Sequence, residues 1–84
     1  MNTKLIERTQ TGVRLEKSLL KVLKGLAEYL EISLGDLLEG IVLHAFEGKA
    51  PFSPETQASI EELKKVYHCS LTAADSHKLK EAGE

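Results

Sequence analysis

The stretch TGVRLEKSLLKVLKGLAEYLEISLGDLLEGIVLHAFE, residues 11–47, carries the strongest patterns in the chain and decides its predicted fold. From about Glu16 onward, apolar residues recur at intervals of three and four, which predicts an amphipathic helix. Ser33 predicts the cap of a second helix over residues 34–46, with Asp36 at the capping-box position usually held by Glu or Gln. The apolar stripe of the first helix comprises Leu19, Leu20, Leu23, Leu26, Ala27 and Leu30.

The second helix has its own apolar stripe, and a third helix follows after a short linker. Gly48 predicts the C-terminal stop of the second helix. Ser53, Pro54 and Glu55 form a typical helix start, so a third helix is predicted from there to about residue 68. The apolar positions of these two helices are Leu37, Leu38, Ile41, Val42, Ala45 and Phe46, then Ile60, Leu63, Val66 and Tyr67.

Upstream of the helices, residues 9–15 alternate between two faces, which predicts one short strand. Arg8, Gln10, Gly12 and Arg14 lie on one face, although glycine weakens a strand. A lone strand with a free edge tends to pair with another chain. We therefore expect a mainly α fold with one short strand, forming a homodimer through an intermolecular two-stranded antiparallel ribbon.

Length and cysteine content indicate the class of protein. The 84 residues fit one small domain, and the single Cys69 excludes an internal disulfide and suits a reducing compartment. The N-terminus has no apolar run of signal-peptide length, and no apolar stretch approaches the roughly 18 residues that span a bilayer. The expectation is a soluble, cytoplasmic protein with no membrane contact.

Charge is unevenly distributed although the net charge is only −2. Residues 1–24 carry six Lys or Arg against two Glu, and residues 25–84 carry five Lys against eleven acidic residues. This asymmetry favours an anionic partner for the N-terminal part. Ordinary solvated surface charge is the alternative interpretation.

Residues 11–47 resemble the ribbon-helix-helix (MetJ/Arc-like) superfamily of DNA-binding proteins, in the order of a short alternating strand, a helix, a turn with a capping Ser and a second apolar helix. The resemblance implies that the ribbon enters the major groove of double-stranded DNA and that Gln10, Gly12 and Arg14 face the bases. Arginine can bond guanine and glutamine can bond adenine through two hydrogen bonds each. Contacts to the DNA backbone are implied for Arg8, Lys17, Lys21, Ser33, Leu34 and Gly35.

The resemblance also suggests a domain organisation. Residues 1–8 form a flexible N-terminal arm, residues 9–48 the ribbon-helix-helix domain and residues 49–84 a C-terminal helical extension. Within that extension, Thr72 predicts the cap of a short fourth helix reaching about residue 80.

The predicted function is a dimeric, sequence-specific DNA-binding transcriptional regulator such as a repressor. Gly12, Asp36 and the acidic remainder of the chain depart from the family pattern, so two alternatives stay open. One is an antitoxin-like protein whose C-terminal segment binds a partner protein, and the other is an interaction dimer that has lost DNA binding. No enzyme, cofactor or metal site is expected, because the residues that invite one lack suitable spacing: His44, His68, Cys69 and His77.

Overall fold

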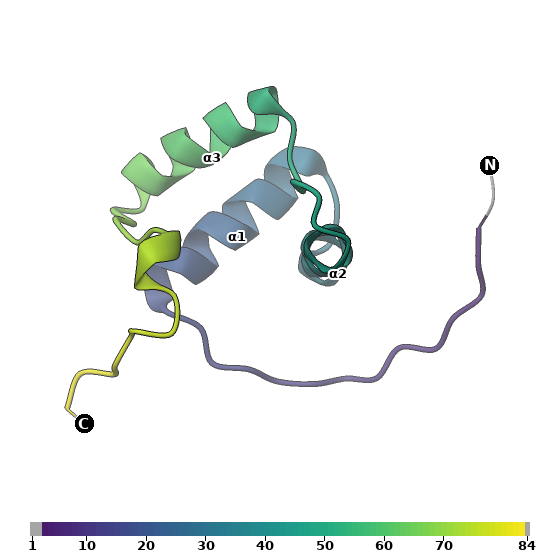
Figure 1. The fold of residues 1–84 in the computed structure, drawn as a ribbon, viewed down its shortest axis with the longest axis horizontal. Coiled ribbons are helices and arrows are strands. Elements are labelled where there is room, and N and C mark those ends of the chain that lie inside the picture. The colour runs from purple at the N-terminus through teal and green to yellow at the C-terminus, as the bar shows by residue number, and fades with distance from the viewer. Residues whose placement is uncertain (1–2, 84) are drawn as a thin grey trace.

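A computed structural model describes residues 3–83 of the chain. The elements are α1 (Lys17–Leu30), α2 (Leu34–Phe46), α3 (Pro54–Val66) and a short 3-10 helix, η1 (Ala73–Asp75). Figure 1 shows α1 and α3 side by side, α2 seen nearly end-on to the right of α1, and the N-terminal segment passing below the helices in this view.

The first two helices begin where the sequence predicts them. Glu16 caps α1, because its carboxylate accepts hydrogen bonds from the backbone N–H of Leu19 at 2.8 Å and from the Ser18 hydroxyl at 2.7 Å. Ser33 caps α2, and its hydroxyl accepts from the backbone N–H of Asp36 at 3.1 Å. The return bond of a capping box, from the cap backbone to the Asp36 carboxylate, is not formed within the described residues.

The connection from α2 to α3 also follows the prediction. Gly48 has a left-handed backbone with φ 70°, and the Lys49 N–H behind it donates to the His44 carbonyl at 2.9 Å. This is the geometry in which glycine closes a helix C-terminus. Ser53 caps α3 by accepting from the Thr56 N–H at 3.2 Å, with a proline at the first helical position. Both boundary predictions are confirmed.

The core lies where α1 meets the other two helices. Leu26, Ala27 and Leu37 form its buried centre, with partly buried side chains from α3 such as Leu63 packed around them. Gly25 faces α3, since a Cβ atom added there would lie 3.1 Å from the Leu63 side chain. The absence of a side chain at Gly25 therefore permits close packing of α1 on α3. The buried hydrophobic residues are Val22, Leu26, Ala27, Leu37 and Cys69.

The predicted strand is wrong. The structure contains no strand over residues 3–83, and residues 9–15 are extended, exposed and unpaired. An alternating pattern makes a strand only when another backbone supplies the hydrogen bonds of a ladder, and no segment of the described part of the chain does so. The fold is therefore three helices preceded by an extended segment. The predicted ribbon-helix-helix fold with an intermolecular ribbon is therefore wrong as well.

Two smaller expectations also fail. The fourth helix was predicted to reach about residue 80, but the structure forms the single turn η1 there. Thr72 and Asp75 form a capping box around this turn. The apolar stripe of α2 is buried only in part, because Leu37 is inside whereas Phe46 is 82 % exposed. The predicted arm 1–8 and extension 49–84 include residues 1, 2 and 84, which lie outside the described residues.

Candidate nucleic-acid interface

A groove separates the extended N-terminal segment from the start of α2. Its volume is about 1070 Å³, and its walls come from residues 6–15 on one side and residues 33–39 on the other. Six of the nine residues that the sequence analysis assigned to DNA contact line this groove: Arg8, Gln10, Gly12, Ser33, Leu34 and Gly35. Segments about 25 positions apart in the sequence thus share one concave surface.

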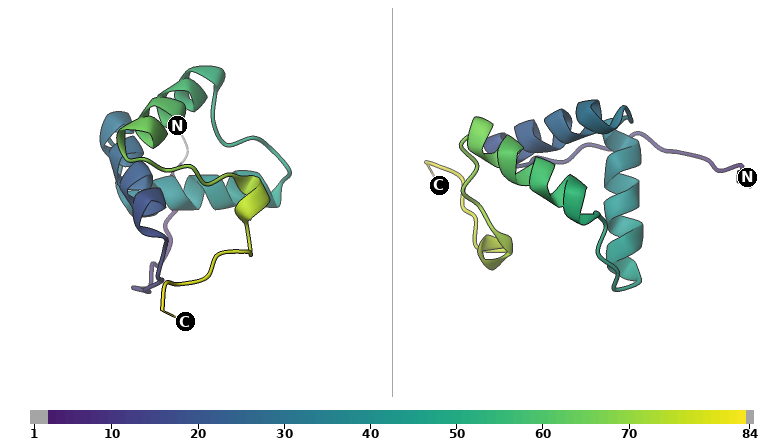
Figure 2. Two further views of the ribbon diagram at one scale, coloured as in Figure 1. Left: turned by 90° about the vertical axis from the view of Figure 1, so that its left-hand side faces the viewer. Right: turned by 90° about the horizontal axis from the view of Figure 1, so that it is seen from above.

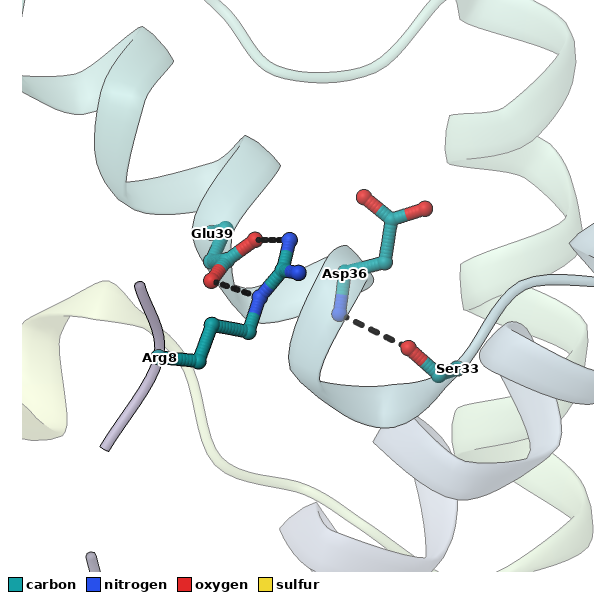
Figure 3. A network of polar contacts seen from close by, with 4 residues as sticks. All are labelled: Arg8, Ser33, Asp36 and Glu39. Carbon is teal, nitrogen blue, oxygen red and sulfur yellow. Dashed lines mark hydrogen bonds and ion pairs between the residues drawn. The ribbon is translucent and has the colours of Figure 1, made fainter. Parts of the chain in front are cut away.

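Arg8 ties the extended segment to α2. Its guanidinium donates to both carboxylate oxygens of Glu39, from Nε and from Nη2, each at 2.9 Å (Figure 3). The pair is exposed, so water screens it. The hydrogen bond from Arg8 is the main cause that lowers the pKa of Glu39, and the same contact raises the pKa of Arg8. The two-point geometry fixes the orientation of the segment against α2.

Arg14 is held by the other end of the chain. Its Nη2 lies 2.6 Å from one carboxylate oxygen of Glu81 and 2.7 Å from the other. Both side chains are largely exposed. The carboxylate occupies the hydrogen-bonding groups that a guanine edge or a phosphate would use, and it therefore competes with DNA for Arg14.

The remaining predicted contacts on this side are unobstructed. Gln10 is exposed between the two arginines, and no atom lies within 4 Å of the position that a Cβ would take at Gly12. Lys17 and Lys21 are exposed on the first turns of α1, outside the groove. In sequence they lie beside Leu15 and Leu20, which line the groove, but the two lysines do not line it themselves.

The N-terminus of α2 offers backbone donors to the groove. The first N–H groups of a helix have no intrahelical acceptor, and those of Leu34 and Gly35 are therefore suited to an anion. The Ser33 hydroxyl already accepts a hydrogen bond from the Asp36 N–H, and Figure 3 shows the Asp36 carboxylate directed away from that hydroxyl. That carboxylate leaves a negative charge in the groove wall, which opposes anion binding there.

Sequence reasoning missed Glu39 and Glu81. They lie 31 and 67 positions from their arginine partners. No local spacing rule connects residues at such distances, and only the path of the extended segment and of the C-terminal segment brings them together. The available signal was the acidic composition of residues 25–84, which predicts that exposed arginines find carboxylates but does not say which ones.

The pKa of Glu39 provides a test of the contact to Arg8. A carboxyl group whose pKa is lowered in the folded state stabilises that state above its ordinary pKa, and this contribution is lost as the pH falls through the lowered value. We expect an NMR pH titration to place the pKa of Glu39 below that of an unpaired glutamate and to show release of the N-terminal segment on acidification. In Arg8→Gln the pKa should return toward the ordinary value. An identical Glu39 pKa in both proteins would contradict the contact.

The outer face of α2 carries a second notable surface. Val42, Leu43 and Phe46 are 43 %, 63 % and 82 % exposed, and Ile6 of the N-terminal segment and Leu38 line a hollow beside Val42 and Leu43. We call these five residues the α2 patch. A helix that is apolar on nearly all sides normally lies buried. The α2 patch therefore exposes apolar side chains to water that would be more stable when buried against protein.

A metal site and a membrane-spanning helix find no support in residues 3–83. No three His, Cys, Asp or Glu side chains gather there to hold a metal ion. No helix in the same part of the chain combines the length and apolar character needed to cross a membrane. A comparison of the chain with protein-family models, curated proteins and solved structures found no match.

Proposed function

We propose that the chain is a DNA-binding regulator of transcription that contacts double-stranded DNA through its extended N-terminal segment. The contact does not use a ribbon. Arg14 and Gln10 would meet base edges, whereas Arg8, Lys17 and Lys21 would meet phosphates. The start of α2 at Ser33, Leu34 and Gly35 would add backbone donors to a phosphate.

The observation that supports this proposal most is the placement of the cationic residues. All six Lys and Arg side chains of residues 3–24 are exposed, and most of the predicted contact residues line one groove. An extended segment with free backbone groups and positive charge can follow the surface of a polyanion without unfolding any helix. Because the rest of the chain is acidic, binding should be modest in affinity and should weaken steeply with salt.

Arg14→Ala tests the proposal directly. We expect the variant to bind specific DNA more weakly by about 1–3 kcal/mol, because it loses its strongest base donor. The measurement is fluorescence anisotropy with a labelled duplex from upstream of the protein's own gene, beside a scrambled duplex and at two salt concentrations. Equal affinity and equal sequence preference for Arg14→Ala and the unmodified protein would reject the assignment. Absence of binding by the unmodified protein to either duplex at low salt would reject DNA binding altogether.

Glu81→Gln refines the same experiment, because it releases Arg14 while leaving the arginine in place. We expect an increase in DNA affinity of up to about fivefold, the range set by an exposed ion pair. Glu61→Gln on α3 is the matched control, since it removes the same charge from an exposed position that forms no ion pair within residues 3–83. If Glu81→Gln and Glu61→Gln increase DNA affinity equally, the cause is weaker general repulsion between the protein and DNA. Competition between Glu81 and DNA for Arg14 is then rejected.

The α2 patch supports a second element of the proposal, a homodimer. Val42, Leu43 and Phe46 leave a large apolar surface in water, and such surfaces usually mark a protein interface. A second copy offers an identical apolar patch, and a two-fold axis lets the two patches cover each other. The same pairing would serve an interaction dimer with no role on DNA, so dimerisation and DNA binding need separate tests.

A further inference from the structure

A second hollow lies between the C-terminal segment and the helices α1 and α3. Its floor is formed by α1 and α3, residues 71–79 form one wall, and Ile41 and Phe52 contribute to the other. Figure 2 shows the C-terminal segment and α2 projecting from the layer of α1 and α3 on either side of this space. Its volume is about 510 Å³, within the range of small-molecule sites.

The lining of this hollow is mostly apolar. Leu19, Leu23 and Ile60 cover the floor, and Leu71 and Leu79 stand in the C-terminal wall. None of these five side chains is fully buried, so they present apolar surface that a ligand would remove from water. Burial of that surface would favour binding by roughly 25 cal/mol for each Å².

The charged groups in the lining indicate which ligand fits. Asp75 is already engaged, since its carboxylate accepts from the Thr72 backbone N–H at 2.8 Å and also from the Thr72 hydroxyl. Lys64 is half-buried and forms no salt bridge to any described residue, unlike its neighbour Lys65, which pairs with Glu62. His77 and Cys69 also line the hollow. The hollow thus combines apolar walls with a carboxylate held by Thr72 and with the Lys64 ammonium, which forms no salt bridge to any described residue.

We infer that this hollow binds a small amphipathic carboxylate, with its apolar chain over α1 and α3 and its carboxylate on Lys64. Charge complementarity with Lys64 favours an anionic head group over a neutral or cationic one, since only an anion can form an ion pair with this ammonium. The site is separate from the groove proposed for DNA and stands whether or not the protein binds DNA.

Decanoate and uncharged 1-decanol are the probes that test this inference. Each is titrated into ¹⁵N-labelled full-length protein, and backbone amide shifts are followed by NMR. We expect saturable shifts at residues 19–26, 60–64 and 71–79, with decanoate binding more tightly than decanol. Shifts confined to α2 around Val42 and Phe46, or no saturable shifts at all, would overturn the inference. This readout uses no DNA, so its failure is distinct from a failure of the proposed function.

Lys64→Met tests the role of the ammonium while keeping an unbranched side chain. We expect decanoate affinity to fall by up to about fivefold and decanol affinity to stay the same. Lys65→Met is the matched control, since it removes the same charge from the next residue, which does not line the hollow. Leu79→Glu, at an exposed position in the wall, should weaken decanoate more than decanol without disturbing the core. Equal effects of Lys64→Met and Lys65→Met, or unchanged binding in Leu79→Glu, would overturn the inference.

Discussion

Replacing Leu26 by alanine is expected to lower the free energy of unfolding by about 2–5 kcal/mol. Leu26 is 2 % exposed and sits at the centre of the cluster in which α1 contacts the other helices. Its truncation removes apolar contacts and leaves a cavity that helices joined by short connections can close only in part. Small domains have total stabilities of about 5–15 kcal/mol, so the variant should lose much of its folded population. Urea denaturation followed by circular dichroism at 222 nm provides the measurement.

Val66→Ala is the control for this experiment. Val66 is 64 % exposed at the end of α3, and a surface truncation of this kind should change stability by no more than about 0.5 kcal/mol. Both variants are compared with the unmodified protein at one protein concentration, because dimerisation makes apparent stability depend on concentration. A loss in Leu26→Ala no larger than that in Val66→Ala would show that the core lies elsewhere.

The three helices could be predicted from the sequence because their signals are local. Ser33 and Ser53 each satisfy a backbone N–H three residues ahead, and Gly48 closes α2 with a left-handed backbone. A hydrogen bond over three residues depends little on the rest of the molecule. The periodic apolar positions of α1 were likewise sufficient to place Leu26 and Ala27 in the core, although Val22 was missed.

The N-terminal segment could not be predicted in this way. Alternation over residues 9–15 indicates which side chains share a face, but a strand also needs a backbone partner, and residues 3–83 do not provide one. The same limit applies to the candidate interface. The sequence pattern predicted Arg8 and Arg14 as contact residues. Their acceptors, Glu39 and Glu81, come from distant segments of the chain. Only the folded path of the chain shows that these residues lie close together.

The apolar stripe of α2 shows a third limit. Periodicity predicted Leu37 and Phe46 as equivalent core positions, whereas the structure buries the first and exposes the second. The stripe is wider than the surface that α1 and α3 offer, since α2 packs on α1 less extensively than α3 does. An apolar pattern indicates that a side chain favours burial, but it does not indicate which surface will cover that side chain. The exposed half of the stripe is the physical basis for the proposed dimer.

Leu43→Glu is expected to dissociate the proposed homodimer. Leu43 is 63 % exposed in the α2 patch, and in a two-fold interface each substitution places two carboxylates in apolar surroundings. A central apolar contact is typically worth about 2 kcal/mol or more, which raises the dissociation constant at least about 30-fold. Sedimentation velocity over a range of protein concentrations measures this change. Val66→Glu is the matched control, because Val66 is 64 % exposed in the last turn of α3 and therefore meets the same helix dipole. A monomeric unmodified protein at every concentration, or equal dissociation of both variants, would rule out the α2 patch as a dimer interface.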